Sequence, residues 1–219
     1  MDLAVVDPVV ATHEPGRVEL RRAQTRGAIL DAAWQLATGA GLEALSLREI
    51  AASVGMQAPS LYSYFPSKAA ILDALFVDGY HALDAEIAAV VAALPAKAAP
   101  RQRLIDLLSA WIGFCQADQA RYRLLFTNAV PGWAPSAEAY GASLANFGQL
   151  TEYLALAGIT EPDDVDLCTA LSAGLVAQQM ANDPGGDRWT RRVDDVVDMV
   201  LRHISSRTRR AARSPKGTS

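Results

Sequence analysis

Residues 46–68 read SLREIAASVGMQAPSLYSYFPSK, and this stretch decides the fold. Ser46 followed three positions later by Glu49 is a capping box, which predicts that a helix begins directly after Ser46. Gly55 tolerates the left-handed backbone that a sharp change of direction requires, so we expect that helix to end there. Pro59 suits the first turn of a second helix over residues 58–64. A short helix, a glycine turn and a second helix together predict a helix-turn-helix unit.

The rest of the chain also carries apolar residues at helical spacing, and alternating strand patterns are nearly absent. Glycine and proline mark the ends of the helical segments. We therefore predict an all-α protein of about nine helices, over residues 18–38, 47–54, 58–64, 68–94, 101–117, 119–128, 136–157, 163–182 and 188–206.

The helices group into a small N-terminal domain and a larger helical domain. With 219 residues, 51% of them hydrophobic, the chain is long enough to bury a core, which excludes a disordered protein. The predicted divisions are a flexible arm (1–16), a three-helix helix-turn-helix domain (17–66), a helical ligand-binding and dimerisation domain (67–206) and a basic flexible tail (207–219).

The charge is distributed unevenly along the chain, although the net charge is −4. Residues 17–68 hold six basic and four acidic side chains, whereas residues 69–200 hold eight basic and seventeen acidic ones. Residues 201–219 hold six basic side chains and no acidic ones. A basic end on an acidic body is typical of a protein that approaches phosphates with one end only, although ordinary surface variation gives the same pattern.

Neither a membrane segment nor a metal site is indicated. Asp2 and Asp7 stand where a signal peptide needs basic residues, and the apolar run 88–94 is too short to span a bilayer, so we expect a cytoplasmic protein without a membrane partner. Cys115 and Cys168 lie far apart, and the three histidines are scattered. We therefore expect no disulfide framework, no metal and no cofactor.

The helix-turn-helix unit also carries a family resemblance. Residues 26–75, RGAILDAAWQLATGAGLEALSLREIAASVGMQAPSLYSYFPSKAAILDAL, resemble the N-terminal domain of the tetracycline-repressor (TetR) family along their whole length. The similarity includes the turn Gly55-Met56 and the pair Ser67-Lys68; RYRLLF (121–126) is more loosely similar to a segment of the family's ligand-binding domains. The resemblance implies a sequence-specific DNA-binding regulator, most simply a repressor that a small, largely apolar ligand releases from a palindromic operator.

Side chains on the outward face of the unit are the candidates for reading bases. The resemblance implies that Arg48 reaches the groove, where a guanidinium can grip guanine; a solvated surface charge is the alternative. Gln57 has the amide that reads adenine. The other candidates are small enough to lie close to base edges: Ala58, Pro59, Ser60 and Ser63.

A second group of side chains is expected to contact phosphates. Tyr62 and Tyr64 match positions where members of the family bond phosphates, and Lys68 combines a cation with free amides at a helix start. Thr25 and Ser46 are expected to add backbone contacts. For Tyr64 the alternative is half-buried packing.

Aromatic residues are concentrated in the middle helices of the larger domain. Aromatic stripes at helical spacing usually belong to a core, but the resemblance implies that this group walls a ligand pocket together with a few polar side chains. Tyr153 is one of these aromatic residues, and Gln149 is one of these polar side chains. The ligand-binding candidates are Trp111, Phe114, Cys115, Tyr122, Phe126, Trp133, Tyr140, Asn146, Phe147 and Gln178.

The last two predicted helices, 163–182 and 188–206, resemble in placement the helices through which the family forms homodimers. A two-fold dimer sets two recognition helices about one DNA turn apart, which matches a palindromic operator.

Two short stretches have the spacing of enzyme motifs. Residues 39–44 fit GxGxxA and residues 141–145 resemble a nucleophile elbow, but neither stretch follows a strand, so catalysis is not expected. A ligand-independent DNA-binding or protein-binding module, and an activator rather than a repressor, remain open.

Overall fold

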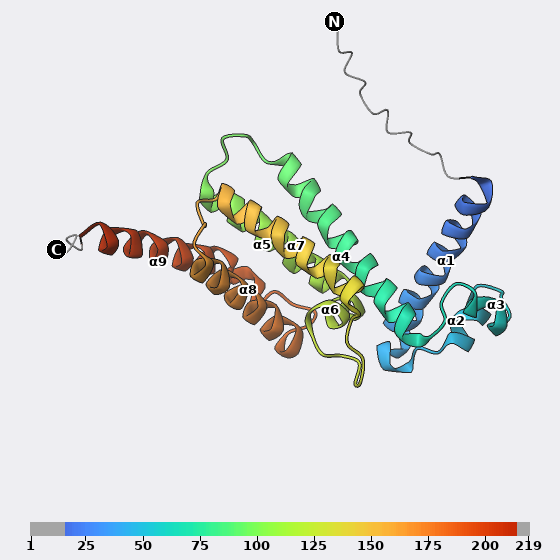
Figure 1. Cartoon of the computed structure of the whole chain (residues 1–219). Helices are drawn as coiled ribbons and strands as arrows, with labels where there is room; N and C mark the ends of the chain where they lie inside the picture. The colour runs from blue at the N-terminus through green and yellow to red at the C-terminus, as the bar shows by residue number, and fades with distance from the viewer. Residues whose placement is uncertain (1–15, 214–219) are drawn as a thin grey trace, which may run out of the picture.

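The computed structural model describes residues 16–213 and confirms the all-α prediction, with no strand in that range (Figure 1). Two short 3-10 helices, η1 and η2, accompany the α-helices. The elements are α1 (Arg17–Ala40), η1 (Leu42–Ala44), α2 (Leu47–Ser53), α3 (Ala58–Tyr62), α4 (Lys68–Ala93), α5 (Pro100–Ala117), α6 (Gln119–Phe126), α7 (Ala137–Leu156), α8 (Pro162–Asn182), η2 (Thr190–Arg192) and α9 (Val193–Arg213).

The largest differences from the predicted helix boundaries lie at the two ends of the last helix. The last helix begins at Val193 rather than at residue 188, because a turn and η2 precede it. It continues to Arg213, so the predicted start of a flexible tail at residue 207 lies inside α9. The predicted arm lies outside the described residues, except for Gly16.

The headpiece, which comprises α1 to α3, packs around a small apolar core. Ile29, Leu61 and Phe65 are all at most 1% exposed. Gly55 has φ 69°, as the sharp turn after α2 requires. The Glu49 amide donates to the Ser46 hydroxyl as predicted, but that hydroxyl in turn donates to the Glu49 carboxylate at 2.7 Å, in place of the expected bond to the backbone.

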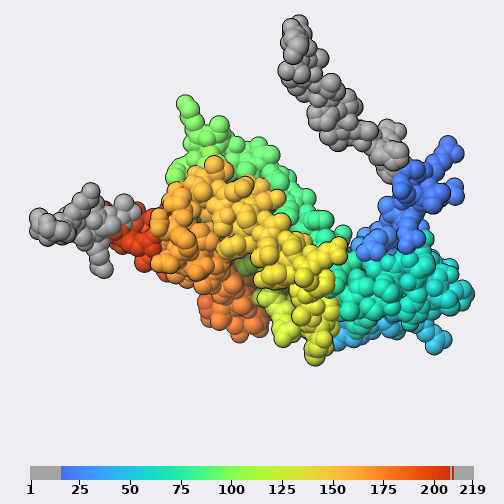
Figure 2. Space-filling model, viewed as in Figure 1, coloured from blue at the N-terminus to red at the C-terminus, as the bar shows by residue number. Residues whose placement is uncertain are grey.

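The body comprises α4 to α9, and the long helix α4 connects it to the headpiece, which projects from one end (Figures 1 and 2). Three carboxylates along α4 each accept a hydrogen bond from a different element. These bonds are Trp133 Nε1 to Asp73 (3.2 Å), Trp34 Nε1 to Asp78 (2.8 Å) and Asn146 Nδ2 to Asp84 (2.6 Å). Helix α4 therefore positions α1, α7 and the segment before α7.

Helix α6 forms a second link between headpiece and body. The Arg121 guanidinium lies over the Trp34 ring, 4.9 Å from its centroid. Arg123 forms an ion pair with Glu43 of η1 at 2.7 Å. On the body side, Leu125 of α6 packs closely on α4 at Gly79, where a Cβ would lie 3.0 Å from a Leu125 methyl carbon and would require that side chain to shift.

Helix α9 packs against α5 and α8. Arg101 of α5 bonds both Asp194 and Asp198 at 2.7 Å, and Arg207 pairs at 2.8 Å with Asp164, a side chain only 4% exposed. No helix of the described residues is long and apolar enough to cross a membrane.

Candidate DNA interface and ligand cavity

Most of the expected base-reading side chains, at the start of α2 and on α3, are exposed. Arg48 is exposed and has no bonding partner among the described residues, and Gln57 is exposed at the N-cap of α3. Pro59, Ser60 and Ser63 are exposed, whereas Ala58 is half-buried. The exposed groups are therefore accessible to a partner, while the buried Leu61 side chain holds α3 against the core of the headpiece.

The two tyrosines of this surface differ in environment. Tyr62 is 52% exposed. Tyr64 is half-buried, and Arg22 lies over its ring, 5.1 Å from the centroid. Arg22 and Arg26 of α1 also donate to the backbone oxygens of Ser63 and Tyr64, at 2.9 and 3.1 Å. These arginines hold the end of α3 in place.

Several expected phosphate contacts are already hydrogen-bonded within the chain. Lys68 Nζ donates to the Glu43 backbone oxygen at 2.7 Å, and the Thr25 hydroxyl donates to Arg21 O at 2.9 Å. The Ser46 hydroxyl is engaged in its cap. A role for these three groups in DNA binding remains a prediction. Lys68 keeps two ammonium hydrogens for a phosphate, whereas the Thr25 and Ser46 hydroxyls have already donated their one hydrogen.

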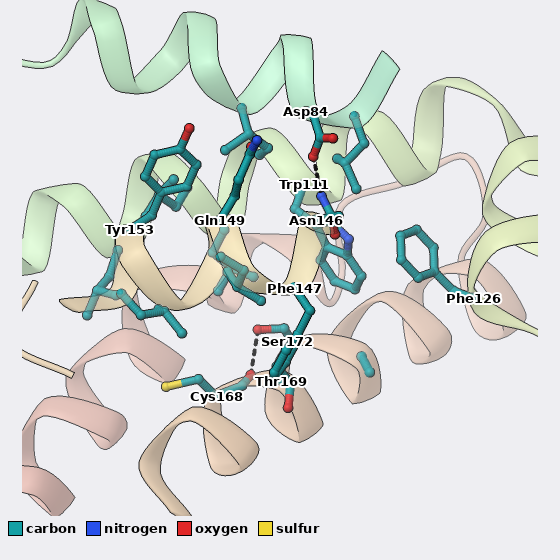
Figure 3. A pocket seen from close by; sticks show the side chains of 18 of the residues that line it. Asp84, Trp111, Phe126, Asn146, Phe147, Gln149, Tyr153, Cys168, Thr169 and Ser172 are labelled. Atoms are coloured by element: carbon teal, nitrogen blue, oxygen red, sulfur yellow. Dashed lines mark hydrogen bonds between the residues drawn. The ribbon is translucent and has the colours of Figure 1, made fainter. Parts of the chain in front are cut away.

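A cavity of about 350 Å³ lies within the body between α4, α5, α6, α7, α8 and α9 (Figure 3). Its size is that of a small-molecule site. Its wall is mainly aliphatic and aromatic. The polar side chains in the wall are Tyr80, Asp84, Ser143, Asn146, Gln149, Tyr153, Cys168, Thr169 and Ser172.

Four of the ten ligand-binding candidates line this cavity, and six do not. Trp111, Phe126, Asn146 and Phe147 belong to the wall, as do Gln149 and Tyr153. The six others lie elsewhere: Phe114 and Cys115 in the core, Tyr122 and Trp133 packed near Phe126 and Phe76, Tyr140 half exposed, and Gln178 exposed with its side chain bonded to Asn182.

The resemblance implies that the end of the fourth helix borders the ligand site, but no residue of α4 was among the candidates. Tyr80 and Asp84 face the cavity one helical turn apart, which is the i, i+4 spacing of a single helix face. That spacing was visible in the sequence, but nothing in it showed that this face of α4 borders a cavity.

Burial raises the pKa of three groups of the body. It raises the pKa of Tyr80 to about 12, with Tyr140 and Asp84 adding to the effect. It raises the pKa of the Cys168 thiol to about 11 and that of the Cys115 thiol to about 12. The cysteines are therefore thiols rather than reactive thiolates. The described residues contain no group of three or more potential metal ligands.

Comparison with known proteins agrees with this geometry. The family of bacterial regulatory proteins called the tetR family matches residues 29–75, the stretch from the middle of α1 into α4. The transcriptional activator FasR of Mycolicibacterium smegmatis is 33% identical over 109 residues, 50% of this chain; the chain spans about half (48%) of FasR.

Solved structures match over most of the chain. The fatty acid degradation regulator FadR of Bacillus halodurans has a TM-score of 0.63 at 17% identity, over 86% of this chain and 97% of that one. FadR of Bacillus subtilis, solved with stearoyl-CoA, has a TM-score of 0.57 at 18% identity, over 80% of this chain and 97% of that one. The headpiece sequence thus matches the tetR family over residues 29–75, and the overall fold agrees with that of these solved structures.

Proposed function

We propose that the exposed surface of α2 and α3 reads a specific palindromic DNA operator. Arg48 and Gln57 carry the base contacts, because both are exposed and have chemistry that matches the edges of guanine and adenine. Tyr62, which is also exposed, positions the headpiece through a phosphate. The small side chains between them leave room for readout of DNA shape.

The body senses a small, largely apolar molecule in its cavity. The observation that carries this proposal is that Tyr80 and Phe126 line the cavity from α4 and α6, the two helices that hold the headpiece. The same two rings pack edge to face with centroids 6.1 Å apart. A ligand that pushes them apart also displaces α4 from α6.

Such a displacement reaches the headpiece through short links. Trp34 of α1 is bonded to α4 through Asp78 and stacked under Arg121 of α6. Arg123 and Glu43 make the second link. A displacement of α4 from α6 therefore rotates the headpiece. A coupling free energy of about 1–3 kcal/mol between ligand and DNA binding is typical of linked binding sites.

A homodimer through α8 and α9 supplies the two recognition helices that a palindrome requires. Of the apolar side chains on these helices, Leu175, Val176, Val193, Val197 and Val200 are buried inside the protomer. The dimer must therefore use the other faces, on which Met199 is 50% exposed and α8 presents the exposed Ala170 and Ala177.

Repression is the simplest outcome, because a bound regulator blocks a promoter and a ligand releases it. Activation is the second candidate, and it is favoured by one observation: the relative FasR is named an activator. Both outcomes use the same DNA surface and the same cavity.

The test is selection of bound sequences from random duplexes, followed by anisotropy titrations of the selected site. Arg48→Ala should weaken specific binding by about 1–3 kcal/mol without lowering the melting temperature. Arg26→Ala is the contrast, because Arg26 bonds Tyr64 O and stacks on Phe65 at 4.1 Å, so its loss should lower stability. Recovery of no enriched site from folded, dimeric protein would contradict the proposal.

A further inference from the structure

Most hydroxyl groups in the cavity wall already donate their hydrogen within the protein. Four of them donate to backbone oxygens of the protein: Tyr80 to Leu125 (3.4 Å), Ser143 to Tyr140 (2.7 Å), Thr169 to Asp166 (2.9 Å) and Ser172 to Cys168 (2.7 Å). A hydroxyl has one hydrogen to donate, so each of these groups retains only its oxygen lone pairs. Toward a ligand they act as acceptors.

The pair Asp84 and Asn146 also offers hydrogen-bond acceptors rather than donors to a ligand (Figure 3). Asn146 Nδ2 donates to Asp84 Oδ1 at 2.6 Å. The carboxylate accepts only, so the amide must turn its NH₂ group toward Asp84 and keep its oxygen for other partners. Asp84 Oδ2 has no hydrogen-bond donor among the described residues. Both side chains therefore present acceptors.

The charge of the wall points in the same direction. Asp84 is the one carboxylate among the lining residues, and none of them is a lysine, arginine or histidine. The segment around it is acidic as well, with seventeen acidic and eight basic side chains over residues 69–200. A carboxylate in a mainly apolar cavity is stabilised by a cation or by hydrogen-bond donors, and a second carboxylate brought beside it is repelled.

We propose that this cavity selects amphipathic cations, namely amines with an apolar chain. It discriminates against carboxylic acids whose apolar chain has the same length. Asp84 accepts the ammonium hydrogens with the Asn146 oxygen beside it. The aromatic rings of Trp111 and Phe126 add faces that attract a cation. The inference rests on the proposed sensing function and specifies the chemistry of its ligand.

The test compares three probes of equal chain length by isothermal titration of the full chain at pH 7: decylammonium, 1-decanol and decanoate. Decylammonium should bind at least about tenfold more tightly than decanoate, with decanol between them. Asp84→Asn keeps the shape and removes the charge, so it should abolish the preference. Glu86→Gln, an exposed carboxylate two residues further along α4, is the matched control and should preserve it.

The outcomes separate this inference from the proposed function. Decanoate binding as tightly as decylammonium, or a preference that survives Asp84→Asn, overturns the cation selectivity but leaves an apolar sensing cavity in place. Failure of all three probes to bind a folded protein counts against the sensing function as well. DNA binding, titrated in the same preparations, shows whether the headpiece function stands in either case.

Discussion

Trp34 Nε1 donates to Asp78 Oδ2 at 2.8 Å across 44 residues of sequence, and this bond joins the headpiece to α4. The indole is 5% exposed, and Arg121 of α6 covers its ring while lying 3.9 Å from the same carboxylate oxygen. Three helices thus meet at one tryptophan. When α4 moves, either this bond lengthens or α1 moves with α4 and takes the headpiece with it.

Trp34→Phe should destabilise the fold, because the donor to Asp78 is lost together with part of the buried ring; the lost hydrogen bond alone accounts for about 1 kcal/mol. For a protein of this size, that loss lowers the melting temperature by roughly 2–4 °C. Trp189→Phe is the matched control: the Trp189 indole nitrogen is buried without a hydrogen-bond partner in the described part of the chain, so its removal loses no bond. An equal fall in melting temperature in the two variants would show that the Trp34–Asp78 hydrogen bond contributes nothing to stability.

Gly79→Ala should disturb the packing of α6 on α4. The added Cβ would lie 3.0 and 3.1 Å from the two Leu125 methyl carbons, and overpacking of a core typically costs about 1–3 kcal/mol. Gly113→Ala in α5 meets nothing within 4 Å, and alanine gains roughly 1 kcal/mol over glycine inside a helix. The same helix gain applies at position 79, so urea unfolding should show Gly79→Ala to be about 1–3 kcal/mol less stable than Gly113→Ala, and equal stability of the two variants would contradict the close packing.

Gln179→Ala should disorder the turn between α8 and α9. The Gln179 side chain is fully buried, donates to the backbone oxygens of Asp183 and Gly186, and accepts from the Trp189 amide at 2.9 Å. Leaving such buried groups unsatisfied costs about 1–3 kcal/mol. Gln178→Ala, one residue earlier, loses only an exposed bond to Asn182 and should be near neutral. Hydrogen exchange of the Trp189 and Thr190 amides checks the local effect: unchanged protection in Gln179→Ala would rule out this role.

Alkaline pH should destabilise the protein through its buried thiols. Burial raises the pKa of Cys115 to about 12, well above the value of an exposed thiol, so the unfolded chain releases a proton that the folded chain keeps. The contribution is fully present below about pH 8.5 and is lost as pH rises toward 12, by at most about 1.4 kcal/mol per pH unit. Tyr80 and Cys168, whose pKa values are also raised by burial, act in the same direction.

Cys115→Ala removes one of these titrations. Its free energy of unfolding should fall less steeply than that of the wild type between pH 9 and 10.5, measured by urea unfolding at each pH. The constant loss from the smaller side chain does not alter this slope. A slope identical to that of the wild type would mean that Cys115 does not titrate differently in the two states.

Local signals in the sequence were sufficient for the headpiece. The cap at Ser46, the left-handed turn at Gly55 and the proline at position 59 act within a few residues of each other, so the chain specifies α2, the turn and α3 without reference to distant partners. The exposed positions of Arg48 and Gln57 follow from that geometry. The order and approximate extent of the other helices followed from apolar periodicity.

The cavity and the links to the headpiece were decided only by the tertiary structure. Periodicity shows which face of a helix is apolar, but not which helix will cover it. Gln178 and Gln179 illustrate the limit, because one residue is about 100° around a helix, and only packing determined that Gln179 is buried. Its side-chain oxygen accepts from the amides of Trp189 and Thr190, which delays the start of α9 to Val193. Likewise, Asp84 meets Asn146 and Asp78 meets Trp34 across 62 and 44 residues, separations that no local pattern spans.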